Sequence, residues 1–477
     1  MDDDQARSGT ARVTRAAWAV FAAYGAAGFA IGTVASRLPT VRAGLGFDST
    51  QMGALLLMWA LGSVLALPLS GIVTTRVGPA RTAATSGVVA AMGHLCLAVG
   101  VTLGNAPLAV VGLFTAGVGE GTWAASTTYE GALVERRLGY SAMPRFQAGE
   151  SLGTVAGSAA GAVLAATGLP LLAHMGLAAV VAAGTALLSS RAFLPPPAMG
   201  THAHADRGDR ARRGSTLHAT LAAWREPRTL LLGLVILGAA LAEGAASDWT
   251  SLGLVSGFGA SEAAGAAGVA VFFSAMLTMR LLGTRLVDRL GRVTALRLCA
   301  GAVLAGVALF ALSPWLPLAL AGSFVWGLGA ALGFPLGVSA ASDDPFRAAM
   351  RVSVVTTIGY CAYIIGPAVI GVVAGHLGYR GALVVVAVPV LVAVLAAGAA
   401  RPLAAPRGGA TASRGASDGG VSDRGASDGG ERAGGAAATD QDPVPTRPTG
   451  DVRSDLAAAP HDAGLRGGPA GATSRTS

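Results

Sequence analysis

The chain contains no lysine, few charged residues and only three cysteines. Charged residues make up 13% of its 477 residues and hydrophobic residues 52%, whereas an ordinary soluble domain is about one-quarter charged. So little charge excludes an ordinary soluble domain and indicates an integral membrane protein. Cys96, Cys299 and Cys361 all lie in apolar stretches, where cysteine behaves as a small hydrophobic residue. We therefore expect no disulfide, no metal site and no cofactor.

Long apolar segments recur along the chain, and each is long enough for a helix of about 20 residues that crosses a bilayer. The expected spans are 17–37, 51–73, 82–103, 106–134, 146–168, 170–190, 229–250, 262–286, 293–312, 315–340, 352–375 and 379–400. The first span is too long for the apolar part of a signal peptide and has no convincing cleavage site, so we interpret it as a retained helix. Twelve spans predict an all-α integral membrane fold.

Two polar segments divide the chain. We expect a cytoplasmic N-terminal arm at 1–16, an N-terminal six-helix bundle at 17–190, a cytoplasmic linker at 191–227, a C-terminal six-helix bundle at 228–400 and a disordered cytoplasmic tail at 401–477. The tail has no aromatic residue and cannot build a core. His202, His204 and Asp206 in the linker are a conceivable metal site, but a plain hydrophilic linker is the favoured interpretation.

The distribution of arginine predicts the orientation in the membrane, since basic residues near short loops favour the cytoplasmic side. All 34 basic residues are arginine, and those of the N-terminal arm and of the loops on the same side are Arg7, Arg12, Arg15, Arg76, Arg81, Arg136, Arg137 and Arg145. We therefore expect both termini in the cytoplasm and the protein in the cytoplasmic (inner) membrane. Arginines that face anionic lipid explain the net charge of +8, so no nucleic-acid partner is needed.

The two halves of the chain carry matching segments after corresponding spans. Residues 46–51 (GFDSTQ) match residues 257–262 (GFGASE) at an offset of 211 residues. Residues 75–78 (TRVG) match residues 288–291 (DRLG) at an offset of 213. The same order of matches in both halves indicates an internal repeat.

The loops of the second match resemble the signature loop of the major facilitator superfamily. The first copy is GIVTTRVGPAR, with Gly71, Arg76, Gly78 and Arg81, and the second is GTRLVDRLGR, with Gly283, Asp288, Arg289 and Gly291. Thr75 stands where the family motif has Asp. The resemblance therefore implies that the charged cytoplasmic latch of this family is weak in the N-terminal half and depends on Asp288 in the C-terminal half.

Shorter segments are similar to the fucose-permease-like and MosC-like branch of that superfamily. They are Ala242-Glu243-Gly244, Asp248-Trp249, Met279-Arg280-Leu281-Leu282-Gly283, Gly359-Tyr360 and Gly366-Pro367. The resemblance implies a secondary active transporter with two six-helix bundles and a site at mid-membrane between them.

Acidic residues inside the spans are the candidates for function, because a charge at the bilayer centre costs about 2.5–3.5 kcal/mol or more. Glu120 lies near the middle of the fourth span, and Trp123, Thr127 and Glu130 follow it on the same helical face. We expect this face to line a water-filled cavity. The other expected cavity residues are Tyr24, Glu243, Trp326, Tyr360 and Tyr363, and a further carboxylate, Glu150, lies near the cytoplasmic start of the fifth span. A structural carboxylate at Glu120 and ordinary core packing of each aromatic residue are the alternatives.

The repeat also predicts an outer gate. The offset of 211 residues places Arg37 opposite Asp248, near the outer ends of the first and seventh spans. We expect these two residues to form an ion pair when the outer mouth is closed. The alternative is an arginine that reaches the lipid headgroups and a hydrated carboxylate.

The resemblance implies a small polar solute, sugar-like or a related metabolite, as substrate and protons as the coupling ion, in a protein that we expect to be monomeric in the lipid. The first span has no carboxylate, which departs from that branch, so an efflux antiporter for drugs or metabolites is a close alternative. A receptor with the same fold is another. The loops show no cluster of His, Asp, Ser or Cys beyond His202 and His204, so we do not expect an enzyme.

Overall fold

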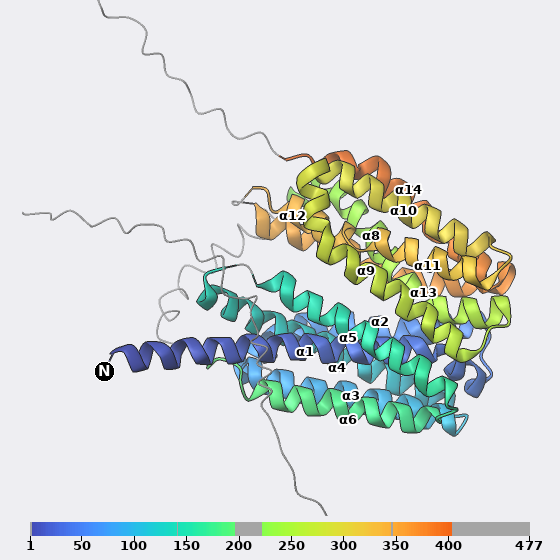
Figure 1. The fold of residues 1–477 in the computed structure, drawn as a ribbon, viewed down its shortest axis with the longest axis horizontal. Coiled ribbons are helices and arrows are strands. Elements are labelled where there is room, and N and C mark those ends of the chain that lie inside the picture. Colours follow the sequence, from blue (N-terminus) through green and yellow to red (C-terminus); the bar gives the residue numbers. More distant parts are fainter. Residues whose placement is uncertain (1, 141, 196–221, 345–346, 403–477) are drawn as a thin grey trace, which may run out of the picture. The chain divides into compact units, whose positions relative to one another are not determined.

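The computed structural model describes residues 2–140, 142–195, 222–344 and 347–402, which form helices joined by short turns (Figure 1). The helices are α1 (Asp2–Leu45), α2 (Ser49–Val77), α3 (Pro79–Thr102), α4 (Ala106–Leu138), α5 (Met143–Ala166), α6 (Leu171–Ser190), α8 (Pro227–Phe258), α9 (Glu262–Leu290), α10 (Arg292–Leu312), α11 (Leu316–Ala330), α12 (Gly333–Ala341), α13 (Ala348–Ala382) and α14 (Ala387–Ala396), with short 3₁₀ helices η1 (Leu383–Val386) and η2 (Ala397–Ala400). This confirms the predicted all-α fold. The expected tail and the His202, His204 and Asp206 cluster lie outside the described residues.

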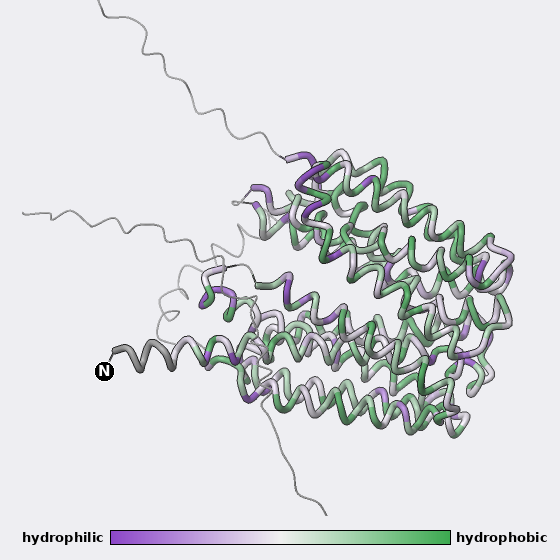
Figure 2. Tube along the Cα trace, viewed as in Figure 1, coloured by the Kyte–Doolittle hydropathy of each residue, from purple (hydrophilic) through white to green (hydrophobic). Residues whose placement is uncertain are grey.

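Ten segments of the described residues are long and apolar enough to cross a membrane. The last of them, Met350–Ala400, is two helices, because Gly378 has a φ of 71° and breaks the helical path. Helix α5 is not among the ten, since glycine, serine and threonine make it less apolar, but its 24 residues are sufficient for a crossing. With these two, the described part of the chain contains the twelve predicted crossings. Figure 2 shows that hydrophilic residues concentrate toward the helix ends.

The helices form two bundles, α1–α6 and α8–α14 (Figure 1). In the first, α1 packs on α5 and α3 packs on α4 and α6; in the second, α8 packs on α13 and α10 packs on α11. The bundles meet where α5 contacts α9 and α2 contacts α13. The helices of the two bundles diverge toward the end that carries the N-terminus, which we call the N-terminal end, and converge at the opposite end (Figure 1).

Glycine allows α1 and α5 to pack backbone against backbone. A methyl group at Gly153 would overlap the carbonyl oxygen of Gly25, and one at Gly28 would overlap that of Glu150. Small residues at such positions let membrane helices approach closely without a hydrophobic driving force between them. The small-residue spacing of α5 therefore positions Glu150 against α1.

We expect Gly153→Ala to lower the free energy of unfolding by about 1–3 kcal/mol, because an added methyl group must push two helix backbones apart. Chemical denaturation of the purified protein in detergent measures this loss. Gly176→Ala in α6 is the matched control, since its added methyl group meets no atom within 4 Å. Equal stabilities of the two variants would contradict the backbone contact.

The turns show the register of the internal repeat. Gly46 and Gly259 adopt left-handed φ values of 64° and 65°, and Gly78 and Gly291 adopt 93° and 78°. Each pair is separated by 213 residues. The offset of 211 predicted for the first match is therefore wrong by two residues, which rotates the predicted partners by about 200° around a helix.

The structure shows no latch at Asp288. Asp288 is exposed and forms no ion pair in the described part of the chain. The charged cluster at this end of the C-terminal bundle is instead built around Asp343, whose carboxylate lies 2.8 Å from Arg228 at the start of α8 and 2.9 Å from Arg292 at the start of α10. Tertiary packing brings α12 over the helix starts, so the acidic partner comes from 51 residues beyond Arg292.

A second ion pair lies beside this one. Arg351 in α13 donates two hydrogen bonds to the carboxylate of Glu226, which precedes α8. Burial raises the pKa of Glu226, but the hydrogen bonds from Arg351 and Thr229 outweigh it, so that pKa lies below its ordinary value. Glu226 is therefore ionised at neutral pH, and the start of α8 is tied to α13.

We expect Asp343→Asn to destabilise the C-terminal bundle by about 3 kcal/mol, since it leaves two partly buried guanidinium groups without their carboxylate. The midpoint of denaturant unfolding measures the effect. Asp288→Asn should change it by less than about 0.5 kcal/mol, as for other exposed side chains. A larger loss of stability for Asp288→Asn than for Asp343→Asn would contradict the conclusion that Asp343 is the main acidic partner in this bundle.

Candidate functional site

A cavity of about 300 Å³ lies between the two bundles. Its polar and aromatic lining residues are Trp59, Ser63, Glu120, Glu150, Ser151 and Thr154 from the first bundle and Glu243, Ser247, Asp248, Phe273, Arg280, Tyr360 and Tyr363 from the second. Polar and aromatic side chains of both bundles therefore line the same cavity. This volume can hold a small solute, up to about the size of a monosaccharide.

Arg280 in α9 is the only basic residue that lines this cavity in the described part of the chain. Its guanidinium donates a hydrogen bond of 2.6 Å to the hydroxyl of Ser151 in α5, across the bundle interface. It also lies 3.5 Å from the carboxylate of Glu243 in α8. Arg280 therefore connects both bundles and neutralises one carboxylate of the cavity.

Glu120 lies in the wall of the first bundle. Its carboxylate accepts a hydrogen bond of 2.7 Å from the indole N–H of Trp59 in α2. The other carboxylate oxygen lies 3.4 Å from the imidazole Nε2 of His94 in α3, and His94 is buried. An acid in contact with both a cavity and a buried imidazole is suited to exchange a proton with either.

Helix α8 turns two carboxylates toward the same cavity. Glu243, Gly244, Ser247 and Asp248 all line it, at the spacing of adjacent positions on one helical face. Glu243 and Asp248 are five residues apart, which is about 140° around the helix, and the cavity is wide enough to reach both. Asp248 is a cavity residue in this structure and not part of a gate.

Several expected cavity residues belong to the helix packing. Trp123 and Thr127 are 1% and 2% exposed inside the first bundle, and Glu130 is fully buried and accepts a hydrogen bond from the backbone N–H of Leu194. A rotation of about 60° around α4 separates Trp123 from Glu120. The expectation that this whole face lines water is therefore wrong.

Two further aromatic residues are also in the protein core. Tyr24 donates or accepts a hydrogen bond of 2.8 Å with Thr128 between α1 and α4. Trp326 is fully buried and packs edge to face on Phe272 and Phe310. Tyr360, in contrast, lines the cavity together with Tyr363. The alternative of core packing thus holds for three of the expected aromatic residues, Trp123, Tyr24 and Trp326.

Sequence reasoning did not select Arg280, Trp59 or His94 for the site. Arg280 stands in the segment that suggested the branch of the family, and an arginine inside a membrane span is itself a signal of function. Trp59 and His94 offer no such signal, because a single tryptophan or histidine in an apolar span is most often part of the core.

The end opposite the N-terminus is closed, but not by the predicted ion pair. Arg37 is buried, and its guanidinium lies 3.9 Å from the carboxylate of Glu262 and donates to the carbonyl of Leu169. Thr40 donates a hydrogen bond of 2.7 Å to the same carboxylate. The predicted Arg37–Asp248 pair is therefore wrong in this closed state. The partner of Arg37 comes from α9, and the repeat does not identify it, since the observed offset of 213 residues places Thr250 opposite Arg37.

We expect Glu262→Ala to open this end more often, since it removes the two polar contacts that the Glu262 carboxylate makes with Arg37 and Thr40 of α1. A cysteine at Ser247, in a background without the three native cysteines, should react at least about threefold faster with a membrane-impermeant reagent added from that side. Thr40→Ala, which removes only one hydrogen bond, should have a smaller effect. Unchanged labelling in Glu262→Ala would show that these contacts do not hold the end closed.

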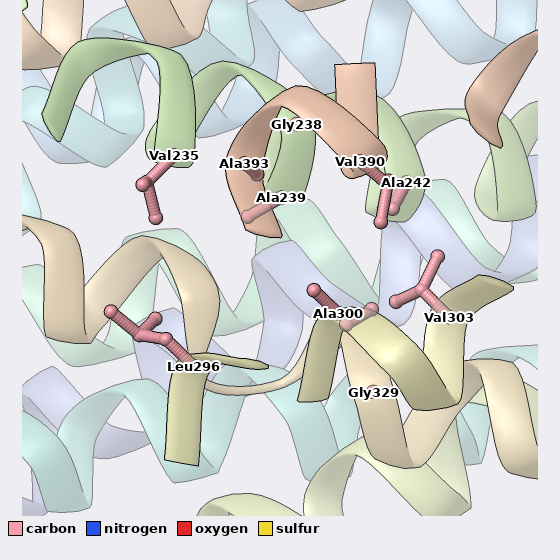
Figure 3. A pocket seen from close by; sticks show the side chains of 11 residues that line it. Val235, Gly238, Ala239, Ala242, Leu296, Ala300, Val303, Gly329, Val390 and Ala393 are labelled. Carbon is pink, nitrogen blue, oxygen red and sulfur yellow. The ribbon is translucent and has the colours of Figure 1, made fainter. Parts of the chain in front are cut away.

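A second cavity, of about 30 Å³, lies inside the C-terminal bundle (Figure 3). Its lining residues are all aliphatic or glycine: Val235, Gly238, Ala239, Ala242, Leu296, Ala300, Val303, Gly329, Ala330, Val390 and Ala393. An apolar space of this size stays dry and has no group that could orient a solute. We interpret it as a packing gap between α8, α10, α11 and α14.

Several known proteins are similar to this chain in sequence or in fold. A transporter of Sinorhizobium fredii, y4wD, is 30% identical over 375 residues, which are 76% of this chain and 95% of that protein. The membrane protein MosC of Rhizobium meliloti is 28% identical over 35% of this chain and 42% of its own. Among solved structures, the nucleoside transporter NupG superposes with a TM-score of 0.65 at 16% identity and covers 82% of this chain and 100% of its own.

The E. coli fucose:proton symporter FucP superposes with a TM-score of 0.55, also at 16% identity, over 80% of this chain and 98% of its own. These similarities support the fucose-permease-like and MosC-like branch. The sequence model of the Major Facilitator Superfamily matches residues 20–345 and 254–458. With its helices in two bundles around a shared cavity, the chain belongs to the major facilitator superfamily of membrane transporters.

Proposed function

We propose that this protein is a secondary active transporter that moves a small polar solute across the cytoplasmic membrane by alternating access, coupled to protons. The observation that carries the proposal is Arg280, which contacts Ser151 of one bundle and Glu243 of the other at the wall of a shared cavity. A solute that replaces these contacts of Arg280 weakens the link between the two bundles, which allows them to move relative to each other. The similar solved structures include a nucleoside transporter and a fucose:proton symporter, which agrees with a polar solute and with protons.

In this proposal the arginine-rich N-terminal end faces the cytoplasm, and the carrier is open toward that side in the conformation described above. The exposed Arg76 and Arg81 lie at that end, as the positive-inside rule requires of cytoplasmic loops. At the opposite end, Glu262 closes the space between α9 and α1. In the outward-open state these contacts separate and the N-terminal ends of the bundles approach each other.

Glu120 carries the coupled proton in this proposal. It faces the cavity and has His94 behind it, with Glu150 as the next carboxylate in the same wall. A protonated Glu120 removes a charge that would otherwise have to cross the membrane with the loaded cavity. Proton release on the cytoplasmic side then resets the carrier.

Uptake into proteoliposomes tests the proposal. We expect purified full-length protein, acting as a monomer, to accumulate a labelled polar solute from a panel of sugars, polyols and amino sugars when the outside is acidic. Accumulation that requires an acidic interior would instead identify an efflux antiporter. Binding without transport in either gradient would identify a receptor with the same fold.

A further inference from the structure

The cavity is lined by more acidic than basic side chains. Its lining includes the four carboxylates of Glu120, Glu150, Glu243 and Asp248 and the single guanidinium of Arg280. Uncompensated charge away from bulk water is costly and is ordinarily paired with an opposite charge. The protein itself supplies too little positive charge for this set, so a bound cation would complete it.

The partners of these carboxylates are unevenly distributed. Glu243 has Arg280 at 3.5 Å, and Arg280 also acts electrostatically on Glu150. Glu120 has the indole N–H of Trp59 and the imidazole of His94. Three of the four carboxylates therefore already have a donor or a positive charge nearby.

Asp248 has none. It is 7% exposed and lines the cavity, and within the described part of the chain it has no hydrogen bond, no ion pair and no charged neighbour. It lies about 7.5 Å further along α8 than Glu243, at a rise of 1.5 Å per residue. The hydroxyl of Ser247 lies beside it in the same wall. A buried carboxylate without a partner, facing a solute cavity, is a binding position for a cation.

The remaining lining fits an organic cation better than a metal ion. Trp59, Phe273, Tyr360 and Tyr363 present aromatic rings to the space, and such rings attract ammonium groups. The hydroxyls of Ser63, Ser151, Thr154 and Ser247 offer hydrogen bonds to a hydroxylated solute. No group of three or more potential metal ligands exists in the described residues.

We propose that the substrate is a polyhydroxylated solute with a primary amine, and that the unpaired carboxylate of Asp248 binds its ammonium group while the hydroxyl side chains of the cavity bind its hydroxyls. This inference rests on the proposed function, because it assumes that the cavity between the bundles is the transport site. It differs from that function in predicting a preference for an amine over the equivalent neutral sugar or polyol.

Matched pairs of solutes test this preference. Binding of glucosamine and glucose, galactosamine and galactose, and 1-amino-1-deoxysorbitol and sorbitol to the full-length protein is measured by calorimetry in detergent. We expect the amine of at least one pair to bind about tenfold more tightly or better, as a hydrogen bond to a charged group predicts. N-Acetylglucosamine, which has no positive charge, should lose this advantage.

The variant Asp248→Asn should reduce the ratio of amine to hydroxyl affinity to about one, whereas Asp288→Asn, at an exposed carboxylate far from the cavity, should leave the ratio unchanged. If Asp248→Asn does not fold, Asp248→Glu and the acetylated sugar still test the role of charge. Neutral members that bind and are transported as well as their amines would overturn the inference but leave the proposed function intact. Absence of binding and transport for every member would overturn both.

Discussion

Replacing Arg280 with alanine is expected to lower the transport rate at least about 100-fold. The guanidinium joins α9 to Ser151 in the other bundle and pairs with Glu243. Breaking a buried ion pair costs about 3–5 kcal/mol. Because 24% of each side chain is exposed, the lower value applies, and about 3 kcal/mol corresponds to roughly 100-fold. Initial rates in proteoliposomes with equal amounts of inserted protein measure the loss.

Two further variants separate the charge from the geometry of Arg280. Arg280→Lys keeps the positive charge but not the planar group that reaches Ser151 and Glu243 together, so it should recover only part of the rate. The double variant Arg280→Ala with Glu243→Gln should recover stability, since the carboxylate left unpaired is gone, but not transport. Full transport activity in Arg280→Ala would rule out Arg280 as a link between the bundles.

Replacing Glu120 with glutamine is expected to abolish accumulation of solute against its gradient while exchange of labelled for unlabelled solute continues. Glutamine can still accept the hydrogen bond from Trp59, so the wall of the cavity stays intact, but it cannot take up a proton. Counterflow and proton-driven uptake, measured on the same proteoliposomes, distinguish the two activities.

Glu130→Gln is the matched control for this experiment. Glu130 lies on the same helix but is fully buried and accepts a hydrogen bond from the backbone N–H of Leu194, a bond that glutamine can also accept. We expect this variant to retain proton-driven accumulation. Loss of accumulation in Glu130→Gln but not in Glu120→Gln would show that Glu130, and not Glu120, carries the coupled proton.

The fold was predictable because it depends on properties that each segment carries by itself. A stretch such as 51–73 excludes charge over the full width of a bilayer, and its backbone groups must then be satisfied inside one helix. The turns were predictable in the same way, since Gly78 and Gly291 both adopt the left-handed φ that glycine permits. Helix α5 was the hardest segment, because glycine and serine weaken its apolar signal.

The site was less predictable, because small rotations decide it. Glu120 and Trp123 are three residues apart, yet one lines the cavity and the other fills the core of the first bundle. The rotation of α4 that separates them depends on how Trp123 packs against Gly87 in α3. The spacing of residues within α4 contains no information about that neighbour.

The amino-acid sequence by itself determined the number of crossings, the polar segments between them and the presence of acids within them, because hydrophobicity and chain length act locally. Only the tertiary structure decided the partners. Arg280 meets Ser151 across 129 residues, and Thr40 meets Glu262 across 222. Such contacts depend on the rotation and register of whole helices. The internal repeat pointed to Asp248 of α8 as the partner of Arg37, whereas the packing of α9 against α1 supplies Glu262.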